Sequence, residues 1–436
     1  MALITKKVYG TEDVLPRDSY KWQFMEDVMR KEALSYGFKE IRTPVFEHTE
    51  LFQRGVGDTT DVVQKEMYTF ETKGGDSVTL RPEGTAGAAR AFLEHALYND
   101  GLPVKASYFV SCYRYEKKQA NRYREFHQFG LEVYGTAAPT ADAELITAAQ
   151  SIFDRLHVTN LQLELNSIGC PECRPNYYAA LTEYFSQYKD QLCETCLSRL
   201  SRNPMRILDC KSPVCSKIAQ GAPVVLDYIC DDCRSHFESV QKYLDGAGVA
   251  YTVNPRIVRG LDYYTRTVFE FVTDALGAQG TVCGGGRYDG LIEQLGGQHL
   301  PSLGFALGME RLLSLMEALG IEIPPAPVCD LYIATLGEAA QMKAFSLIEQ
   351  VRRSSLIAEG DIVGRSLRAQ MKYADKIGAK FSMVLGDNEM AQNCAVLKNM
   401  QTGQQTQVPL DDTFFEKFFA VYLDADSKAL MEQLQT

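Results

Sequence analysis

The stretch CYRYEKKQANRYREFHQFGLEV, residues 112–133, decides the fold that we expect for this chain. Arg114, Arg122 and Arg124 fall within eleven residues and are flanked by alternating aromatic and aliphatic positions. Such alternation is typical of β-strands, so the sequence predicts two strands, SYFVSCYRYE and FHQFGLEVYG, joined as a hairpin by a polar loop at 117–121. A hairpin that carries three guanidinium groups in an acidic chain indicates a site for an anion.

The second strand of this hairpin has an unusual face. Residues two apart in a strand share a face, which places Gln128, Gly130 and Glu132 together. A glycine between two polar side chains packs poorly against a core, but it leaves room for a small polar ligand with a positive group. Phe126 shares the face and is placed to stack on a base. Taken alone, the pattern is better explained by a solvated hairpin with ordinary surface arginines.

Four other segments place a proline or glycine turn beside arginine at a predicted strand end. They are TLRPEGT with Arg81 and Glu83, RGLDYYTRTVFEF with Arg259 and Asp262, GGGRYDG with Arg287 and Asp289, and GFALGMER with Arg311. Together they predict one ligand of considerable negative charge, and a triphosphate fits. The sequence contains neither G-x-x-x-x-G-K-[ST] nor G-x-G-x-x-G, so arginine forks on a sheet would hold the phosphates.

Length and composition limit the class of protein. A chain of 436 residues predicts two or three domains. The content of 45% apolar and 23% charged residues is that of a globular protein, and a net charge of −11 argues against a surface that coats nucleic acid, although not against a local basic patch. No apolar run reaches the ~18 residues that a membrane span needs, and no signal peptide is visible. We therefore expect a cytoplasmic protein.

The pattern along the chain predicts three units. Helical spacing covers Asp18–Tyr36, a strand closed by Pro44 follows, and Thr85 is a candidate N-cap for the next helix. After the proline-rich linker GIEIPPAPVCD, the strands LYIATL, GDIVGRSL and FSMVLG alternate with helices and predict a small α/β domain. The expected division is a mostly antiparallel catalytic core at 1–169 and 236–326, a Cys-rich insertion at 170–235, and the α/β domain at 327–436.

The insertion has the spacing of a metal-binding segment. Eight of the twelve cysteines form four close pairs, Cys170 with Cys173, Cys193 with Cys196, Cys210 with Cys215, and Cys230 with Cys233. Zn²⁺ takes four ligands, so four pairs can build two tetrahedral thiolate sites, and we predict structural zinc at one or two sites. Spacing does not fix which pairs combine, and His236 is a possible replacement for one cysteine. Reduced, buried thiols without metal are the alternative.

A basic stripe marks the last domain. In GRSLRAQMKYADKIGAK the cationic residues recur every three or four positions, and on a helix they would share a face: Arg365, Arg368, Lys372, Lys376 and Lys380. A solvated helix face explains many such stripes. Contact with nucleic acid is the alternative.

The ordered motifs resemble those of a known family. The segment around Pro44, the hairpin and GFALGMERL resemble the three motifs of class II aminoacyl-tRNA synthetases, and LRPEGT, RGLDYYTRTVFEF and GGRYDGLIEQLGG resemble the histidyl-tRNA synthetase family. The resemblance runs from YGTEDVLP into the C-terminal domain. It implies an α+β catalytic core on a mostly antiparallel sheet, an insertion that contacts the tRNA acceptor stem, and a C-terminal anticodon-binding domain. It further implies a homodimer that uses ATP with Mg²⁺, L-histidine and tRNA(His).

The resemblance also assigns roles to residues. Arg259 and Arg114 would act at the reacting α-phosphorus, and ATP would be held by Arg114, Glu116, Arg122, Phe126 and Arg311. Histidine would be bound by Glu83, Gly84, Thr85, Arg114, Gln128, Glu132, Arg259, Tyr263, Tyr264 and Tyr288. The eight paired cysteines depart from the family pattern, in which the insertion need not bind metal.

Two rival functions share this core. The first is a catalytically inactive relative, the regulatory subunit of ATP phosphoribosyltransferase, which would lack the C-terminal domain and the equivalent of Arg259. The second is a ligase of the same core that does not use tRNA. The presence of Arg259, the insertion and the basic stripe favours the synthetase.

Overall fold

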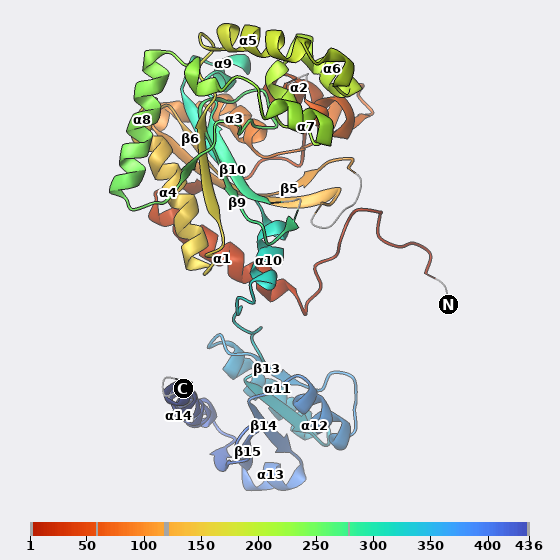
Figure 1. Cartoon of the computed structure of the whole chain (residues 1–436). Coiled ribbons are helices and arrows are strands. Elements are labelled where there is room, and N and C mark those ends of the chain that lie inside the picture. Colours follow the sequence, from red (N-terminus) through yellow and green to blue (C-terminus); the bar gives the residue numbers. More distant parts are fainter. Residues whose placement is uncertain (1–2, 58–59, 117–121, 278–279, 434–436) are drawn as a thin grey trace. The chain divides into compact units, whose positions relative to one another are not determined.

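The computed structural model describes residues 3–57, 60–116, 122–277 and 280–433. The predicted polar loop at 117–121 lies outside these ranges. The chain forms two compact units, Met1–Pro324 and Pro325–Thr436, which are described separately (Figure 1). Within the described ranges, no helix combines the length and the apolar character that a membrane crossing requires.

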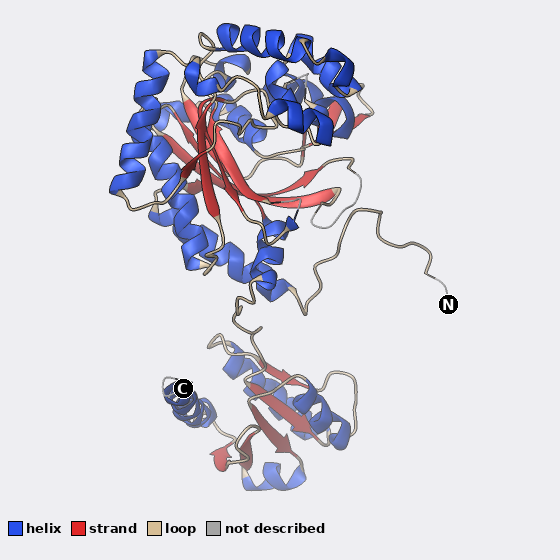
Figure 2. Ribbon diagram, in the orientation of Figure 1, coloured by secondary structure: helices blue, strands red, loops and turns tan. Residues whose placement is uncertain are grey.

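The first unit is built on an eight-stranded sheet (Figure 2). All neighbouring strands run antiparallel except β1 with β5 and β7 with β8. This confirms the predicted mostly antiparallel core. The strands, in order across the sheet, are β1 (Lys39–Glu40), β5 (Val104–Tyr113), β6 (Glu125–Tyr134), β11 (Ser302–Gly308), β10 (Thr281–Arg287), β9 (Thr265–Val272), β7 (Gln162–Ser167) and β8 (Thr252–Val253).

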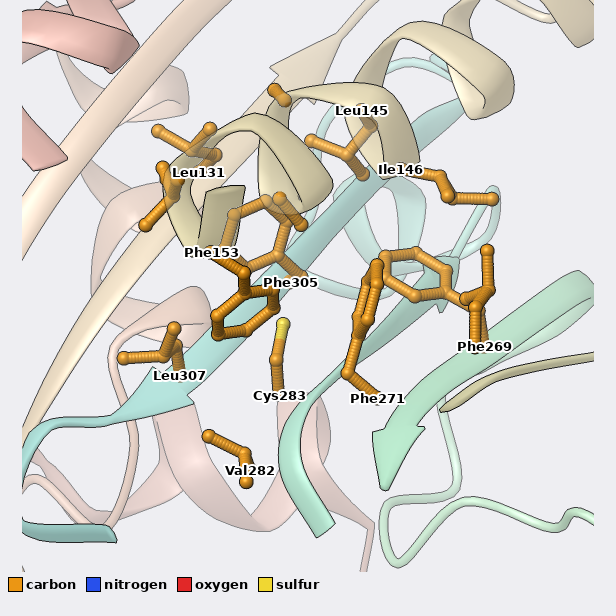
Figure 3. Packing of buried hydrophobic residues seen from close by; sticks show 14 of the residues in the cluster. Leu131, Leu145, Ile146, Phe153, Phe269, Phe271, Val282, Cys283, Phe305 and Leu307 are labelled. Carbon is orange, nitrogen blue, oxygen red and sulfur yellow. The ribbon is translucent and has the colours of Figure 1, made fainter. Parts of the chain in front are cut away.

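One face of this sheet carries the hydrophobic core. Alternate residues of β6, β11 and β9 point into it, among them Leu131, Phe305 and Phe271 (Figure 3). Each fully buried side chain of this size contributes about 1.5–3 kcal/mol to folding. Because side chains alternate along a strand, Gln128, Gly130 and Glu132 of β6 point to the opposite face. The helices that cover the core are α1 (Ser19–Ser35), α4 (Pro139–Arg155), α8 (Asp231–Gly246) and α10 (Met309–Ala318), with α4 and α8 side by side (Figure 1).

The segment around Pro44 forms separate short elements rather than one strand. A three-stranded sheet has the order β2 (Phe46–His48), β4 (Ser77–Leu80) and β3 (Tyr68–Glu71).

The prediction that Thr85 is an N-cap is wrong, because helix α3 (Thr85–Glu94) begins at this residue. The carboxylate of Glu83 accepts the N–H groups of Thr85 and Ala86, each at 2.7 Å, and so fills the capping role. The other elements here are α2 (Thr49–Val56), the π-helix η1 (Val62–Glu66), the 3₁₀ helix η2 (Leu97–Asp100) and α9 (Leu291–Gln294).

The Cys-rich segment is helical and packs within the first unit. Its elements are α5 (Arg174–Ser186), η3 (Lys189–Gln191), α6 (Glu194–Arg202), η4 (Pro204–Ile207), α7 (Pro213–Ala219) and η5 (Val225–Asp227). Buried Leu181, Phe185 and Ile207 give it an apolar interior. Helix α8 begins at Asp231, so the predicted boundary at 235/236 falls inside this helix.

The second unit is a small α/β domain, as the sequence predicts. Its sheet has the order β13-β12-β14-β15-β16, in which β13, β12 and β14 are parallel. The predicted strand GDIVGRSL is mostly loop, since β13 ends at Gly360. The elements are β12 (Leu331–Thr335), α11 (Glu338–Arg352), β13 (Ala358–Gly360), α12 (Leu367–Lys376), β14 (Phe381–Leu385), α13 (Asp387–Gln392), β15 (Cys394–Asn399), β16 (Gln405–Pro409) and α14 (Phe414–Gln433).

Candidate active site

A cavity of about 670 Å³ lies in the first unit. Eleven of the residues predicted to bind ATP or histidine line it: Glu83, Thr85, Arg114, Glu116, Arg122, Phe126, Gln128, Arg259, Tyr263, Tyr264 and Arg311. They come from both strands of the hairpin, from the start of α3, from the segment before β9 and from the first turn of α10. The fold thus gathers residues that are far apart in the sequence into one polar site.

The hairpin arginines are held in place by backbone and aromatic contacts. Arg114 Nε donates to the carbonyl of Pro82 at 2.9 Å, and its guanidinium carbon lies 5.2 Å from the ring centroid of Phe126. Arg122 forms an ion pair with Glu116. Burial, together with the charges of Arg122 and Arg114, lowers the pKa of Arg311. Such crowding of positive charge indicates a place for an anion of several charges.

Arg259 lines the same cavity and has its own counterion. It forms an ion pair with Glu270 on β9, and its guanidinium carbon lies 5.5 Å from the ring centroid of Tyr264. Burial opposes the charge, but Glu270 outweighs burial and raises the pKa of Arg259. Its Nε atom is buried and has no hydrogen-bond partner among the described residues. Arg259 therefore keeps a donor that a ligand in the cavity could use.

Two of the four arginines predicted at strand ends, Arg81 and Arg287, have structural roles and do not line the cavity. Arg287 is fully buried and donates from Nε and Nη2 to Asp142, the shortest of these contacts being 2.7 Å. Arg81 is also buried and donates to the carbonyls of Ser111, Thr43 and Pro44. Neither arginine lines the cavity. The interpretation that all four bind one anion is therefore wrong for Arg81 and Arg287.

The space beside Gly130 is filled by the protein itself. A Cβ atom at Gly130 would lie 2.3 Å from Cζ of Tyr108, so the glycine admits this tyrosine rather than a ligand. Tyr108 donates to Glu132 at 2.8 Å, and Tyr288 donates to the other oxygen of the same carboxylate. Burial raises the pKa of Glu132 to about 8. Glu132 and Tyr288 thus belong to a buried network, outside the cavity wall.

A second buried carboxyl group, that of Glu83, lies in the cavity wall. Burial raises the pKa of Glu83, and the N–H groups that it accepts from α3 act in the opposite direction. Tyr263 and Tyr264 pack together with ring centroids 4.7 Å apart, and Tyr288 lies edge-on to Tyr263 at 5.4 Å. Gly84 is absent from the cavity wall, and a Cβ atom there would lie 2.3 Å from the Tyr108 ring. The cavity wall thus places aromatic rings and a carboxyl group in one site, and both kinds of group attract cations.

Several residues of the site are not evident from the sequence alone. Glu270, which pairs with Arg259, could have been found by strand alternation, because it lies between Phe269 and Phe271 of the core face. Part of the wall comes from the Cys-rich segment, and no local pattern predicts that contact. Those residues are Thr195, Arg199, Arg206, Asp209, Lys211 and Ser212, together with Cys193 and Cys210, which the sequence predicts only as metal ligands.

The eight paired cysteines assemble into two groups of four. One group is Cys170, Cys173, Cys230 and Cys233, and the other is Cys193, Cys196, Cys210 and Cys215, with the sulfur atoms of each within 4.8 Å of one another. Tetrahedral zinc with Zn–S bonds of about 2.3 Å requires sulfur separations of about 3.8 Å. The Sγ atom of Cys170 lies 3.6 Å from that of Cys173 and 3.9 Å from that of Cys230. The Sγ atoms of Cys193 and Cys210 are 3.9 Å apart.

The suggestion that His236 replaces a cysteine does not fit these groups. Its Nε2 lies 3.2 Å from the carboxylate of Asp142, the partner of Arg287, and it belongs to neither cysteine group. All eight cysteines are unbridged thiols. Both groups have the donor set and the spacing of a closed zinc site.

The basic stripe of the second unit is shorter than predicted. Arg368, Lys372 and Lys376 lie on α12 with exposed side chains. Arg365 precedes the helix and pairs with Asp361 at 2.8 Å, while Lys380 follows it and pairs with Asp330 at 3.0 Å. The five residues therefore do not share one helix face, and three exposed cations remain.

Comparison with known proteins adds independent findings. The family model described as histidyl-tRNA synthetase matches residues 10–172 and 219–312, and the anticodon binding domain model matches residues 330–416. The chain is 54% identical over 403 residues to a histidine–tRNA ligase of Clostridium novyi, covering 92% of this chain and 96% of that protein. It is 52% identical over 410 residues to that of Caldanaerobacter subterraneus, covering 94% and 98%. The crystal structure of apo histidyl-tRNA synthetase from S. aureus superposes with a TM-score of 0.82 at 39% identity, covering 95% of this chain and all of that one.

Proposed function

The chain belongs to the histidyl-tRNA synthetase family, and we propose that its cavity joins ATP to histidine and passes the histidine to tRNA(His). The protein is a histidine–tRNA ligase. In the first step a histidine carboxylate oxygen bonds to the α-phosphorus of ATP while the bond to the β-phosphate oxygen breaks, giving histidyl-adenylate and pyrophosphate. In the second step a hydroxyl of the terminal ribose attacks the carbonyl carbon, loses its proton, and displaces AMP.

One observation carries the proposed mechanism: Arg114 and Arg259 line the same cavity. The carboxylate is already a nucleophile and needs no general base. The protein must bring two anions together and stabilise the charge that builds at the phosphorus atom, which is a matter of positioning and electrostatics. Two guanidinium groups from separate segments are suited to both tasks, since they are permanently charged and can each donate two hydrogen bonds.

ATP lies, in this proposal, along the hairpin. Phe126 stacks on adenine, while Arg122, Arg311 and Glu116 hold the nucleotide. Mg²⁺ bound together with ATP would supply neutralisation of part of the phosphate charge. Glu66 and Glu116 line the cavity, and their carboxylate oxygens would be the protein ligands of such an ion.

Histidine lies, in this proposal, at the Glu83 end. Glu83 faces its ammonium group, Thr85 and Gln128 contact its polar atoms, and the rings of Tyr263 and Tyr264 flank the imidazole. Glu132 and Tyr288 lie behind the cavity wall and support it through their buried hydrogen-bond network with Tyr108. This arrangement accounts for selectivity, because a site with buried hydrogen-bonding groups rejects an amino acid that leaves them unpaired.

The remaining parts of the chain serve tRNA. We assign residues 1–169 and 236–326 to the catalytic domain, 170–235 to an insertion that contacts the acceptor stem, and 327–436 to anticodon binding. The exposed cations Arg368, Lys372 and Lys376 support the last assignment, since phosphate contacts supply most of the affinity for nucleic acid. A cytoplasmic location is part of this proposal.

We also propose that each cysteine group holds one structural Zn²⁺. Four sulfur ligands close the coordination shell, so the metal stabilises the insertion and does not enter the chemistry. Metal analysis of reduced protein is expected to give about two zinc ions per chain, released on acid treatment as the thiolates protonate. A value below ~0.5 zinc per chain contradicts the sites.

A homodimer is the proposed assembly. Val45, Phe46 and Phe70 are exposed on or beside the three-stranded sheet, with 42%, 53% and 48% of their surface accessible. Exposed apolar side chains that lie close together are typical of interfaces between proteins. Sedimentation of the wild-type protein should give a dimer and Phe46→Asp a monomer; a monomeric wild type contradicts the proposal.

Substrate assays separate this function from its rivals. We expect ATP–pyrophosphate exchange with histidine alone among the twenty amino acids, followed by charging of total tRNA with histidine. A regulatory subunit shows no exchange, and a ligase that does not use tRNA shows exchange without charging. Either result contradicts the proposed function.

A further inference from the structure

The two cysteine groups differ in their relation to the cavity. Cys193 and Cys210 are themselves part of its wall, as are Asp209, Lys211 and Ser212 beside them. None of the described wall residues belongs to the group formed by Cys170, Cys173, Cys230 and Cys233. We call the group of Cys193, Cys196, Cys210 and Cys215 the cavity group and the other the outer group.

The chain between Cys196 and Cys210 holds the backbone beside Arg259. Arg206 is buried, and its Nη1 donates to the carbonyl of Arg259 at 2.8 Å. Asn203 Nδ2 donates to Asp262 at 3.1 Å, and Arg199 Nη2 donates to Asp61 at 2.8 Å. Side chains of the insertion therefore contact the segment that carries Arg259 at two points.

These contacts depend on a segment with little regular structure. Arg199 Nη1 supports it internally by donating to the carbonyl of Arg206 at 3.2 Å. Between helices α6 and α7 lies only the 3₁₀ helix η4, whose hydrogen bonds are weaker than those of an α-helix. Cys196 lies on α6 before the segment, and Cys210 lies four residues after Arg206. A metal bound by both cysteines would fix the two ends of the segment and thereby the position of Arg206.

We propose that zinc in the cavity group is a positioning element of the active site, which keeps Arg206 against the Arg259 carbonyl and so aims Arg259 at the α-phosphorus. This inference rests on the proposed function. Arg206 is a positioning residue, because it acts through Arg259. The outer group ties the start of α5 to the start of α8, and Arg174 of α5 donates to the carbonyl of Tyr264. Metal in the outer group supports the fold with a smaller effect on Arg259.

A matched pair of variants separates the groups. Cys196→Ser and Cys173→Ser each replace the buried second cysteine of a Cys-x-x-Cys pair, one in the cavity group and one in the outer group. Each should lose about one zinc ion per chain. We expect kcat for histidine-dependent ATP–pyrophosphate exchange to fall at least about tenfold further in Cys196→Ser than in Cys173→Ser, because small misplacements of a catalytic group have large effects. Equal losses, or full activity in Cys196→Ser after loss of its metal, overturn the inference.

Cobalt gives a readout that does not depend on activity. Loaded with Co²⁺, the Cys173→Ser protein reports the cavity group alone and the Cys196→Ser protein the outer group alone, through thiolate-to-cobalt absorption. Addition of ATP with Mg²⁺ should change the spectrum of the first protein and leave that of the second unchanged. An unchanged first spectrum, or equal changes in both, overturns the inference.

Arg206 provides a test without any cysteine change, and it decides the matter if a cysteine variant fails to fold. Arg206→Ala should lower kcat for exchange with little change in KM for histidine, and Arg206→Lys should restore part of kcat by keeping a donor for the Arg259 carbonyl. If Arg206→Ala and Arg206→Lys have the same kcat and lose zinc or thermal stability to the same extent, Arg206 is not a positioning residue. Absence of histidine-dependent exchange in the wild-type protein would instead contradict the proposed function.

Discussion

Arg114 and Arg259 come from distant parts of the chain and line one cavity. Each is held by different partners: Arg114 by the carbonyl of Pro82 and the ring of Phe126, Arg259 by Glu270 and the ring of Tyr264. Two like charges can share a cavity because these partners offset the cost of burying them. Donors fixed in this way before substrate binds need no reorganisation during the reaction, which is the condition for strong electrostatic catalysis.

Gly284 provides a way to move Arg259 without removing it. A Cβ atom at Gly284 would lie 2.5 Å from both Nη atoms of Arg259, so Gly284→Ala displaces the guanidinium. The displaced group is the far end of a flexible side chain, so the fold should tolerate the change. We expect kcat for histidine-dependent exchange to fall on the order of 10²-fold, as for other small misplacements at active sites, while the thermal unfolding midpoint changes little.

Gly55→Ala is the control for this substitution. Gly55 is a buried glycine of helix α2, and an added Cβ would make only ordinary contacts, the nearest being 3.5 Å from Ala86. Its exchange activity should equal that of the wild type. Equal activity of Gly284→Ala and Gly55→Ala would mean that the position of Arg259 does not matter.

The buried carboxyl of Glu132 should make stability depend on pH. Because burial raises its pKa from 4.5 to about 8, the folded protein keeps a proton in this window that the unfolded chain has lost. The free energy of unfolding should therefore fall as pH rises through the window, by at most about 1.4 kcal/mol per pH unit for this group. Glu132→Gln cannot titrate and should flatten the dependence.

Urea unfolding of both proteins at several pH values between about 5 and 8 measures this effect. The raised pKa of Glu83 contributes a slope of the same sign to both proteins, so the difference between them isolates Glu132. Parallel curves for the wild type and Glu132→Gln would contradict a buried proton at this residue.

The sequence predicts the hairpin, the mostly antiparallel sheet and eleven of the residues that line the cavity, because each depends on local alternation or on motifs that act together. It does not distinguish Arg259, which lines the cavity, from Arg287, which is saturated by Asp142 and backbone carbonyls. Both are next to glycine in the sequence, Arg259 before Gly260 and Arg287 after Gly286, and only the three-dimensional partners separate a ligand-binding arginine from a structural one. The sequence also does not show what fills the space beside Gly130, because Tyr108, which occupies it, comes from the neighbouring strand.

The exposed cations of α12 should affect tRNA and nothing else. The double variant Arg368→Glu and Lys372→Glu reverses two charges and should raise KM for tRNA about tenfold or more, since each lost phosphate contact weakens binding. Exchange activity, which does not involve tRNA, should stay at the wild-type value. Raising the salt concentration should reduce the difference in KM for tRNA between the variant and the wild type.

A charge-matched control distinguishes this surface from a general effect of net charge. Lys398 on β15 and Lys417 on α14 are exposed cations of the same unit. Reversing both to glutamate changes the net charge by the same amount. Equal increases in KM for tRNA in the two double variants would remove α12 from the proposed tRNA contact.

The most direct test of the account is the rate of histidine-dependent ATP–pyrophosphate exchange in Arg259→Ala. We predict that kcat falls by at least about 10²-fold, the usual cost of removing one group that stabilises charge in the transition state. The KM for ATP should change little, because Arg114, Arg122 and Arg311 still line the cavity, whereas the unfolding midpoint should fall because Glu270 loses its ion-pair partner. Near-normal exchange in a folded Arg259→Ala protein would contradict the role of paired guanidinium groups at the α-phosphorus.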